Sequence, residues 1–331
     1  MSRIVIFGAG TDGRLLLPKL RQHDHEVLAF ADNSPLRQGT CFEGLPVLAP
    51  DRLSAMDFDV IHLALPASAP VAQQLATLGI GQERLRSPLF EPANQAGIAA
   101  LRNAHQGQEA WIIGNGPSLR ISDLTALQER GALTFAFNKI YLAFGESPFR
   151  PTYYLVEDLL VAENNAIQIK GLGGFYKLFP ESVLRYLGQD QETTVFGLSP
   201  LPKEDEAINI SQDPNWFYCG ATVTYVAIQW ALFMGFKTIY LIGIDFSFMT
   251  AGLATMNESK VFISCGEINH FHPDYRKLGE LWMRPYMDIQ ARAFRTARIF
   301  TESEGIGIFN ATRGGFLEIF PRVDLDIILS T

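Results

Sequence analysis

Cysteine and positive charge are both scarce in this chain of 331 residues. The three cysteines, Cys41, Cys219 and Cys265, lie far apart and form no Cys-x-x-Cys pair. This argues against a disulfide framework or a cysteine metal site and favours a reducing compartment. Lys and Arg number 27 against 35 Asp and Glu, which gives a net charge of −8. The chain therefore lacks the basic face of a nucleic-acid-binding protein, whereas a nucleotide would need only local donors.

Long apolar runs are also lacking. The longest, residues 225–234, is interrupted by Gln229 and is too short to span a bilayer. The first residues lead directly into an expected strand, without the charged and apolar regions of a signal peptide. We expect a cytoplasmic protein, and the sequence leaves peripheral membrane association and oligomerisation open.

What the chain does contain is a recurring order of apolar strand, turn and helix. In the first part, strands are expected at 3–7, 26–31, 59–65 and near 85, with a helix at 13–22 and another around residues 71–78. After Trp111 the order restarts, with strands expected at 133–137, 152–156, 238–244 and 306–309, and helices at 119–130, 220–234 and 285–304. This order is typical of parallel sheets.

We therefore predict an α/β protein with two Rossmann-like, doubly wound domains and mostly parallel sheets. The domains are expected at 1–90 and 110–331, joined by a linker at 91–109. Residues 188–215 are expected to form a polar loop. Residues 250–282 are expected to form an irregular binding loop, since long irregular segments often serve as lids.

A glycine-rich turn follows the first expected strand. Gly8, Gly10 and Gly13 match G-x-G-x-x-G, a pattern that brings the phosphates of a nucleotide to a helix N-terminus. Asp32 ends the second strand, where it is placed to hydrogen-bond a ribose hydroxyl. These residues are candidate nucleotide contacts, and the alternative is a turn that only closes the fold.

This first region resembles the N-terminal domains of bacterial sugar O- and N-acyltransferases. The matching segments are Gly8-Ala9-Gly10, Asp32-Asn33 and Gly44-Leu45-Pro46-Val47. The resemblance implies a sugar-nucleotide or regulatory pocket rather than a redox site.

A second turn of this kind, Gly114-Asn115-Gly116-Pro117-Ser118, is the most informative segment, and we name it the central turn. Its glycines let backbone approach a ligand closely. Pro117 suits a first helical turn, and Ser118 and Ser122 are candidates to cap exposed N–H groups. A helix start of this kind favours phosphate.

Several further polar or small residues fall where an expected strand ends or a helix begins. They are Asn138, Lys139, Gly220, Ala221, Thr222, Asp245, Asn310, Thr312 and Arg313. Because open parallel sheets bind ligands beyond the carboxyl ends of their strands, we expect these residues and the central turn to form one site. The alternative for Asn115 and Asn138 is turn chemistry, since Asn tolerates left-handed backbone.

Residues 108–325 resemble bacterial sialyltransferases of glycosyltransferase family 42, motility-accessory-factor glycosyltransferases and archaeal-type 6-hydroxymethylpterin pyrophosphokinases. The central turn, Phe137-Asn138-Lys139 and the run 241–246 (Leu-Ile-Gly-Ile-Asp-Phe) carry the resemblance. It implies a pocket for the CMP part of a CMP-sugar, lined by the central turn, residues 138 and 220–222, with Asp245 at its floor. The 310–315 segment (Asn-Ala-Thr-Arg-Gly-Gly) fits the surface-polysaccharide branch and is expected to complete this pocket.

The segment 269–275, Asn-His-Phe-His-Pro-Asp-Tyr, is the densest polar and aromatic cluster. A glycosyl transfer needs a base for the acceptor hydroxyl and groups that stabilise the departing phosphate. The sialyltransferase relatives use a His base and tyrosines for these roles, which implies His270 as the base, with His272 second, and Tyr275 on the phosphate. The alternatives are a divalent metal site and histidines that only cap a loop; the spacing favours no dedicated metal site.

We expect an inverting glycosyltransferase that moves a sialic-acid-like, ulosonic sugar from a CMP donor to a glycan or protein hydroxyl. The setting would be bacterial surface polysaccharide or flagellin glycosylation, with no required cofactor. One alternative is an ATP-dependent 6-hydroxymethylpterin pyrophosphokinase, for which Mg²⁺ would bind near Asp245 and Asp274. The other is a non-catalytic sugar-nucleotide-binding protein of a polysaccharide assembly complex.

Overall fold

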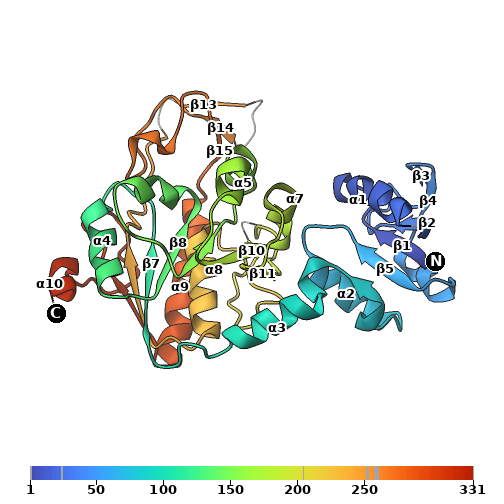
Figure 1. Ribbon diagram of the computed structural model, residues 1–331, viewed down its shortest axis with the longest axis horizontal. Helices are drawn as coiled ribbons and strands as arrows, with labels where there is room; N and C mark the ends of the chain where they lie inside the picture. Colours follow the sequence, from blue (N-terminus) through green and yellow to red (C-terminus); the bar gives the residue numbers. More distant parts are fainter. Residues whose placement is uncertain (1, 24, 204, 251–252, 257–260, 331) are drawn as a thin grey trace. The chain divides into compact units, whose positions relative to one another are not determined.

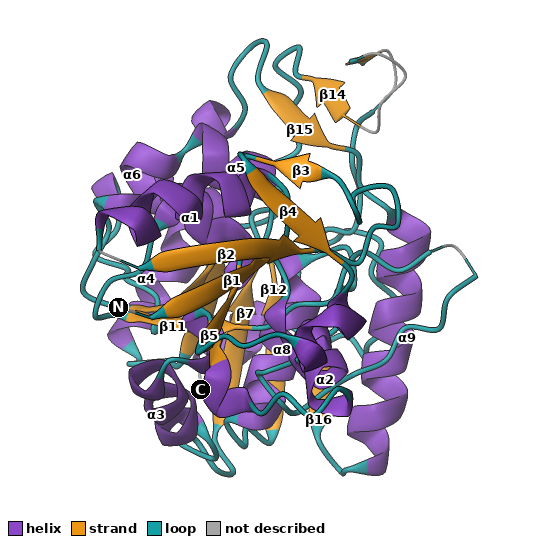
Figure 2. Cartoon of the chain, turned by 90° about the vertical axis from the view of Figure 1, so that its right-hand side faces the viewer, coloured by secondary structure: helices purple, strands orange, loops and turns teal. Residues whose placement is uncertain are grey.

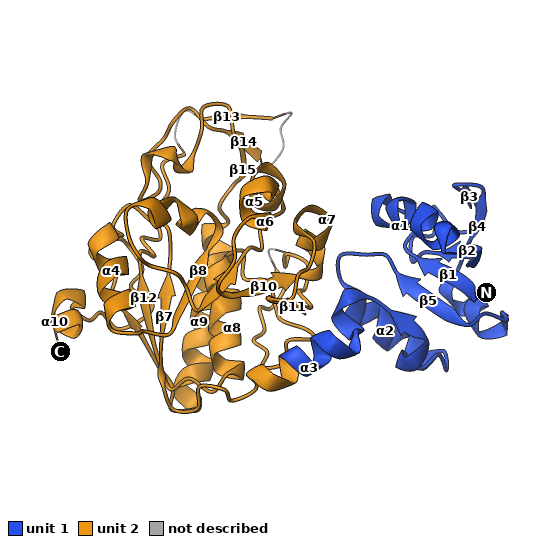
Figure 3. Cartoon of the chain, in the orientation of Figure 1, with its two compact units in different colours: residues 1–97 blue, residues 98–331 orange. Residues whose placement is uncertain are grey.

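The computed structural model describes residues 2–23, 25–203, 205–250, 253–256 and 261–330. The chain divides into two compact units, residues 1–97 and 98–331 (Figure 3). The division falls within α3 (Pro92–Leu101), a helix in the segment 91–109 that is expected from the sequence to be the linker. Both units are α/β and mostly parallel, which confirms the predicted fold class.

The first unit is built on a six-stranded sheet in the order β3-β4-β2-β1-β5-β6 (Figure 2). The β3–β4 pair is antiparallel, and the other neighbouring pairs are parallel. Its elements are β1 (Arg3–Phe7), α1 (Thr11–Gln22), β2 (Glu26–Ala31), β3 (Cys41–Phe42), β4 (Leu45–Leu48), η1 (Pro50–Ala55), β5 (Val60–Leu63), α2 (Ser68–Thr77), η2 (Gln82–Arg84), β6 (Leu85–Arg86) and η3 (Pro88–Phe90).

Alternate residues of β1 pack into two cores, one on each face of the sheet. Ile4 and Ile6 share a core with Leu17 of α1, whereas Val5 shares the opposite core with Leu75 of α2. A strand buried on both faces reads as a continuous apolar run, and the run at 3–7 is predictable for that reason.

The second unit contains a seven-stranded, fully parallel sheet in the order β11-β10-β9-β8-β7-β12-β16. Its strands are β7 (Glu109–Ile113), β8 (Thr134–Phe137), β9 (Tyr153–Leu155), β10 (Tyr176–Pro180), β11 (Thr193–Phe196), β12 (Thr238–Ile242) and β16 (Gly307–Asn310). Its helices are α4 (Ile121–Glu129), η4 (Asn138–Gly145), α5 (Leu159–Asn164), α6 (Ala166–Lys170), η5 (Glu181–Val183), α7 (Leu184–Leu187), α8 (Val223–Phe233), η6 (Pro273–Tyr275), α9 (Met287–Ser303) and α10 (Leu325–Ser330).

Helices cover both faces of this sheet (Figure 1). On one face, α4 to α7 and α10 share a core with the sheet that includes Trp111, Leu124 and Tyr154. Helix α8 contacts both β7 and α9, and all its residues from Thr224 to Phe233 are buried. A helix that is apolar all round is expected in such an interior position.

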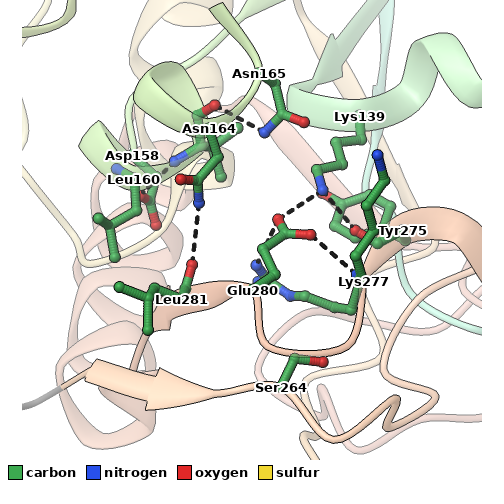
Figure 4. A network of polar contacts seen from close by, with 12 residues as sticks. Lys139, Asp158, Leu160, Asn164, Asn165, Ser264, Tyr275, Lys277, Glu280 and Leu281 are labelled. Atoms are coloured by element: carbon green, nitrogen blue, oxygen red, sulfur yellow. Dashed lines mark hydrogen bonds and ion pairs between the residues drawn. The ribbon is translucent and has the colours of Figure 1, made fainter. Parts of the chain in front are cut away.

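A small antiparallel sheet, β13-β14-β15, covers part of the segment 250–282 that the sequence predicts to be irregular and ends one residue beyond it. Its strands are β13 (Ala254–Thr255), β14 (Val261–Ile263) and β15 (Leu281–Met283). Two contacts join the β15 end of the segment to the main body (Figure 4): Asn164 of α5 donates to the Leu281 carbonyl at 3.2 Å, and Lys139 pairs with Glu280.

Two local expectations are wrong. Residues 193–196 form a buried strand at the edge of the sheet, inside the expected loop at 188–215. Its residues, two threonines followed by Val195 and Phe196, are types that favour strands. Helix α4 begins at Ile121 rather than directly after the central turn. Its N-terminus is closed by Arg120 and Asp123, so Ser118 does not cap it.

Candidate functional site

The candidate site lies where the order of strands reverses in the large sheet. The chain runs from β7 outward through β8 to β11, then crosses to β12 on the other side of β7. Polar ligands of open α/β sheets bind in the crevice beyond the carboxyl ends of the strands at such a point. A cavity of about 150 Å³ opens here, which we name the site cavity.

The site cavity gathers most of the segments that the sequence singles out. The predicted residues that line it are Gly114, Asn115, Gly116, Asn138, Thr222, Asp245, His270 and Tyr275. They come from the ends of β7, β8 and β12, from the start of α8 and from the 269–275 segment. Segments far apart in the sequence therefore converge on one space.

Glycine is required in the central turn because two backbones touch there. The Gly116 N–H donates to the Gly243 carbonyl at 2.9 Å, and a Cβ on Gly114 would lie 2.3 Å from the same oxygen. A Cβ on Gly116 would lie 1.9 Å from Asp245 Oδ2. The turn after β7 thus packs directly against the turn after β12, and a side chain on Gly114 or Gly116 would push the two turns apart.

Asp245 is held by Ser118. The Ser118 hydroxyl donates to Asp245 Oδ2 at 2.8 Å, and the Ser118 N–H lies 3.4 Å from the same oxygen. Burial raises the pKa of Asp245, and these hydrogen bonds partly oppose the effect. Ser118 thus acts on the site through Asp245. Neither it nor Pro117 is among the residues that line the cavity.

The two asparagines each keep an acceptor free. Asn115 donates to the Phe137 carbonyl at 3.1 Å, but its Oδ1 is buried with no partner in the described part of the chain. Asn138 Oδ1 is likewise buried without a partner among the described residues, and the Asn138 backbone is left-handed, with φ of 50°. Turn chemistry explains the backbone of Asn138, whereas two buried unpaired acceptors beside a cavity point to a ligand with donors.

The 220–222 turn places the start of α8 against the cavity. Thr222 caps the helix by accepting from the Thr224 N–H at 3.3 Å, and Val223 and Thr224 also line the cavity. Gly220 packs where a Cβ would lie 2.6 Å from the Tyr225 ring, and Ala221 has φ of 58°. The free N–H groups and the dipole of a helix start favour an anionic group at this wall.

His270 and Tyr275 stack face to face, with ring centroids 3.7 Å apart and an interplanar angle of 6°. Burial, with Arg276 and Lys139 nearby, holds the pKa of His270 well below its ordinary value, so the imidazole is neutral near pH 7. Its Nδ1 is buried without a partner among the described residues. Burial raises the pKa of Tyr275 to about 12, so the phenol keeps its proton.

His272 and Lys139 are engaged elsewhere. His272 Nδ1 accepts from the Asp274 N–H at 3.1 Å and so caps η6, and its Nε2 lies 3.4 Å from Glu146. Lys139 donates to the Tyr275 carbonyl at 2.8 Å and to Glu280 at 2.6 Å (Figure 4). Neither residue is among those that line the site cavity.

Three predicted site residues at the end of β16 also lie outside the cavity lining; they are Asn310, Thr312 and Arg313. Asn310 is fully buried and donates to the Leu317 carbonyl at 2.7 Å, and the Thr312 hydroxyl accepts from the Ile244 N–H at 3.1 Å. Arg313 pairs with Asp123 at 2.6 Å and with Asp326. Thr312 therefore helps to fix the loop after β12, whereas Asn310 and Arg313 make contacts elsewhere in the second unit.

Sequence reasoning missed several residues at this edge. Asn269 and Gln290 line the cavity, and Glu157 follows β9 two strands from the switch point. The strand at 152–156 is predicted, so the rule that polar residues at strand ends form sites would have found Glu157. No comparable pattern marks Gln290, which reaches the cavity from the first turn of α9 and donates to the Ala221 carbonyl at 2.9 Å.

A second cavity, of about 270 Å³, lies in the first unit. Ala9, Gly10, Arg14 and Arg37 are among the residues that line it, whereas Gly8, Gly13 and Asp32 are not. Gly8 and Gly13 are required by packing: a Cβ on Gly13 would lie 2.1 Å from the Gly8 carbonyl oxygen.

Asp32 is already occupied by protein groups. It accepts from the N–H groups of Ala9 at 2.9 Å and Ser34 at 2.8 Å, and from Arg37 at 3.0 Å. These hydrogen bonds keep the pKa of Asp32 low despite its burial. The carboxylate therefore braces the glycine turn, and its contact with a ribose stays a prediction.

The described residues contain no group of three or more His, Cys, Asp or Glu side chains placed to hold a metal ion. Within the same residues, no helix combines the length and apolar character that a bilayer crossing requires. The three cysteines are free thiols, with Cys219 buried.

Comparison with known protein families matches two parts of the chain to different family models. Residues 90–251 match the family model described as 6-hydroxymethylpterin diphosphokinase MptE-like, and residues 1–85 match the model described as C2185-like, N-terminal. The first match confirms the predicted resemblance at the level of the wider group that includes the pterin pyrophosphokinases. The sialyltransferase character of the second unit and the acyltransferase-like character of the first stay predictions.

Among curated proteins, none matches the chain. A solved structure with local similarity is UDP-D-quinovosamine 4-dehydrogenase from Vibrio fischeri, at 24% identity and a TM-score of 0.22. The similarity covers 24% of this chain and 73% of that one. Similarity at this level does not bear on function.

Proposed function

We propose that this chain is a transferase whose second unit binds a nucleotide-activated donor in the site cavity and passes a group to a hydroxyl acceptor. The observation that carries the proposal is the convergence on one cavity of the α8 start, two unpaired asparagine oxygens and the stacked His270–Tyr275 pair. The helix start suits a phosphate, the asparagines suit ligand donors, and the ring pair suits proton transfer.

As donor we propose a CMP-activated, sialic-acid-like sugar, and as acceptor a glycan or protein hydroxyl in bacterial surface polysaccharide or flagellin. In this reaction the acceptor oxygen bonds to the anomeric carbon while the bond from that carbon to the phosphate oxygen breaks, and its electron pair leaves with CMP. The acceptor proton passes to His270, which its burial keeps neutral and able to accept it. Tyr275 and the α8 start would stabilise the departing phosphate.

A second candidate is diphosphate transfer from ATP to a hydroxymethylpterin, which the family match of residues 90–251 favours. This reaction would use Mg²⁺ held by carboxylates and phosphates. Asp245 lines the cavity, but the Asp274 carboxylate is exposed, 4.0 Å from His272 Nδ1 and outside the lining. The two do not form the pair that this reaction needs, so we rank it second.

The first test is calorimetric titration of the whole chain with CMP in the absence of metal, and then with ATP plus Mg²⁺. We expect metal-independent binding of CMP that weakens about tenfold in Asn138→Ala, the cost of one lost hydrogen bond to a charged or buried group. Binding of ATP with Mg²⁺ but not of CMP would move the assignment to the pyrophosphokinase. Binding of CMP without transfer to any glycan would favour the non-catalytic alternative.

A further inference from the structure

A buried carboxyl group beside the site cavity has no role in the proposed reaction. Glu157 lies two residues beyond Leu155, the last residue of β9, which pairs with Phe137 of β8. Phe137 and the next residue, Asn138, line the site cavity. Glu157 therefore stands at the same carboxyl edge of the sheet, one strand further from the switch point.

One oxygen of this carboxyl group has a partner and the other has none. The Cys219 thiol donates to Glu157 Oε1 at 3.2 Å. Oε2 is buried and accepts no hydrogen bond from any residue that the structure describes. An unsatisfied buried acceptor costs roughly 1–3 kcal/mol, and native proteins seldom keep one without a ligand or water to fill it.

The surroundings of Glu157 connect it to the site cavity. Cys219 directly precedes the 220–222 turn, and its sulfur accepts from the Ala221 N–H at 3.5 Å. Ala221 in turn accepts from Gln290, which lines the cavity. Burial raises the pKa of Glu157 to about 7, and the neighbouring Asp158 acts in the same direction. The carboxyl group is thus suited to a neutral or partly charged hydrogen-bond partner from a ligand.

We propose that Glu157 recognises an exocyclic amine on the heterocycle of the bound ligand, at a subsite between the end of β9 and the 219–222 turn. A carboxyl oxygen accepts from such an amine, as Asp and Glu do from N4 of cytosine. A cytosine and a pterin share this chemistry, since each carries an amino group on its ring. The inference rests on the proposed function, because it assigns a base-reading residue to the same site.

The test compares CMP with UMP, in which a carbonyl replaces the amine, by calorimetry on the whole chain. We expect the wild type to prefer CMP by about tenfold or more, the usual worth of one base contact. Glu157→Gln should remove about that factor from CMP affinity and leave UMP affinity unchanged or higher. Glu163→Gln, on an exposed position of α5, is the matched control and should change neither.

A parallel arm uses 6-hydroxymethylpterin and its analogue with a carbonyl in place of the 2-amino group. If Glu157→Gln loses the preference for the amine-bearing ligand in this arm and not in the CMP arm, the recognised amine is that of a pterin rather than a cytosine. Glu157→Asp keeps a carboxyl group one methylene shorter, and it should retain a weaker preference for the amine in whichever arm responds.

Different results would contradict the inference on Glu157 and the proposed function. If folded Glu157→Gln, verified by circular dichroism, keeps the wild-type ratio of CMP to UMP and the wild-type ratio of pterin to its analogue, the inference is overturned. The proposed function would survive that result. If the wild type binds neither nucleotide, nor ATP with Mg²⁺, nor the pterin, both proposals are overturned.

Discussion

The His270 imidazole lies parallel to the Tyr275 ring, with centroids 3.7 Å apart, and both rings border the site cavity. If His270 is the base, His270→Asn should lower the transfer rate by roughly 10²–10⁴-fold, the usual contribution of general base catalysis. Because Asn keeps a polar side chain of similar reach, donor affinity should change much less. A radiolabelled or coupled transfer assay measures the first effect and calorimetry the second.

His272→Ala is the matched control, since His272 already caps η6 with its Nδ1. It should reduce stability slightly and leave turnover within a few-fold of the wild type. A large loss of turnover in His272→Ala, together with normal turnover in His270→Asn, would identify His272 as the base and contradict our assignment.

The pH profile gives a second prediction for His270. Its pKa is held well below the ordinary value, so it stays deprotonated as the pH falls through the ordinary histidine range. We therefore expect kcat/KM to stay flat between about pH 8 and pH 6.5, where an ordinary histidine base would already lose rate. A decline with a midpoint near the ordinary histidine pKa would show that another group, or a more exposed imidazole, is the base.

Much of this site could be predicted from the sequence because its parts follow strands with strong apolar signals. The strands ending near Ile113, Phe137 and Ile242 are buried runs, and the polar residues after them meet at one edge because the sheet is parallel. The strand-end rule is not sufficient for Arg313. Its position after a strand predicts a ligand contact, but Asp326 and the sequence-distant Asp123 form ion pairs with it instead.

Strand β11 shows the same limit for the fold. Its four residues carry too short a pattern to stand out from the polar segment around them, and only the pairing with β10 makes them a strand. Gln290 depends likewise on its tertiary neighbours, since an amide in a helix is common in sequences and rarely marks a site. Glu157 differs, because it follows a predicted strand and the strand-end rule covers it.

Gly116→Ala tests the contact between the central turn and the β12 loop. The new methyl group would lie 1.9 Å from Asp245 Oδ2, so either the turn or the Asp245–Ser118 pair must move. We expect a loss of stability of about 1–3 kcal/mol, typical of overpacking, and loss of measurable nucleotide binding. Gly145→Ala is the control, because a Cβ there meets nothing within 4 Å. Equal effects in the two variants would exclude a special role for Gly116.

The buried ion pair between Lys139 and Glu280 provides a further prediction. Their side chains are only 4% and 10% exposed, and the pair joins η4 to the segment that leads into β15. Glu280→Gln should destabilise the protein by about 3 kcal/mol, because it leaves a buried ammonium without its counter-charge. Glu318→Gln, which breaks an exposed pair with Arg322, should have no measurable effect on the thermal midpoint.

The same pair distinguishes a structural role of Lys139 from donor binding. In the double variant Lys139→Met/Glu280→Met, two apolar side chains replace the charges, and stability should recover most of the loss. If CMP affinity recovers with it, Lys139 acts by holding the segment in place. If stability recovers and affinity does not, Lys139 contacts the donor directly, as its position at the end of a strand predicts.

The buried carboxyl group of Glu157 makes a prediction about stability that does not depend on any ligand. Its pKa is raised from 4.5 to about 7 in the folded chain, so the folded state binds this proton more tightly than the unfolded state. The resulting stabilisation is complete below the unfolded pKa and is lost as the pH rises through about 7. Between about pH 5.5 and pH 8.5 the wild type should therefore lose about 2 kcal/mol that Glu157→Gln does not lose. Urea unfolding of both proteins at the two pH values measures the difference, and Glu163→Gln should follow the wild type. Parallel pH dependence in the wild type and Glu157→Gln would mean that this carboxyl group is hydrated and ionises normally in the folded protein.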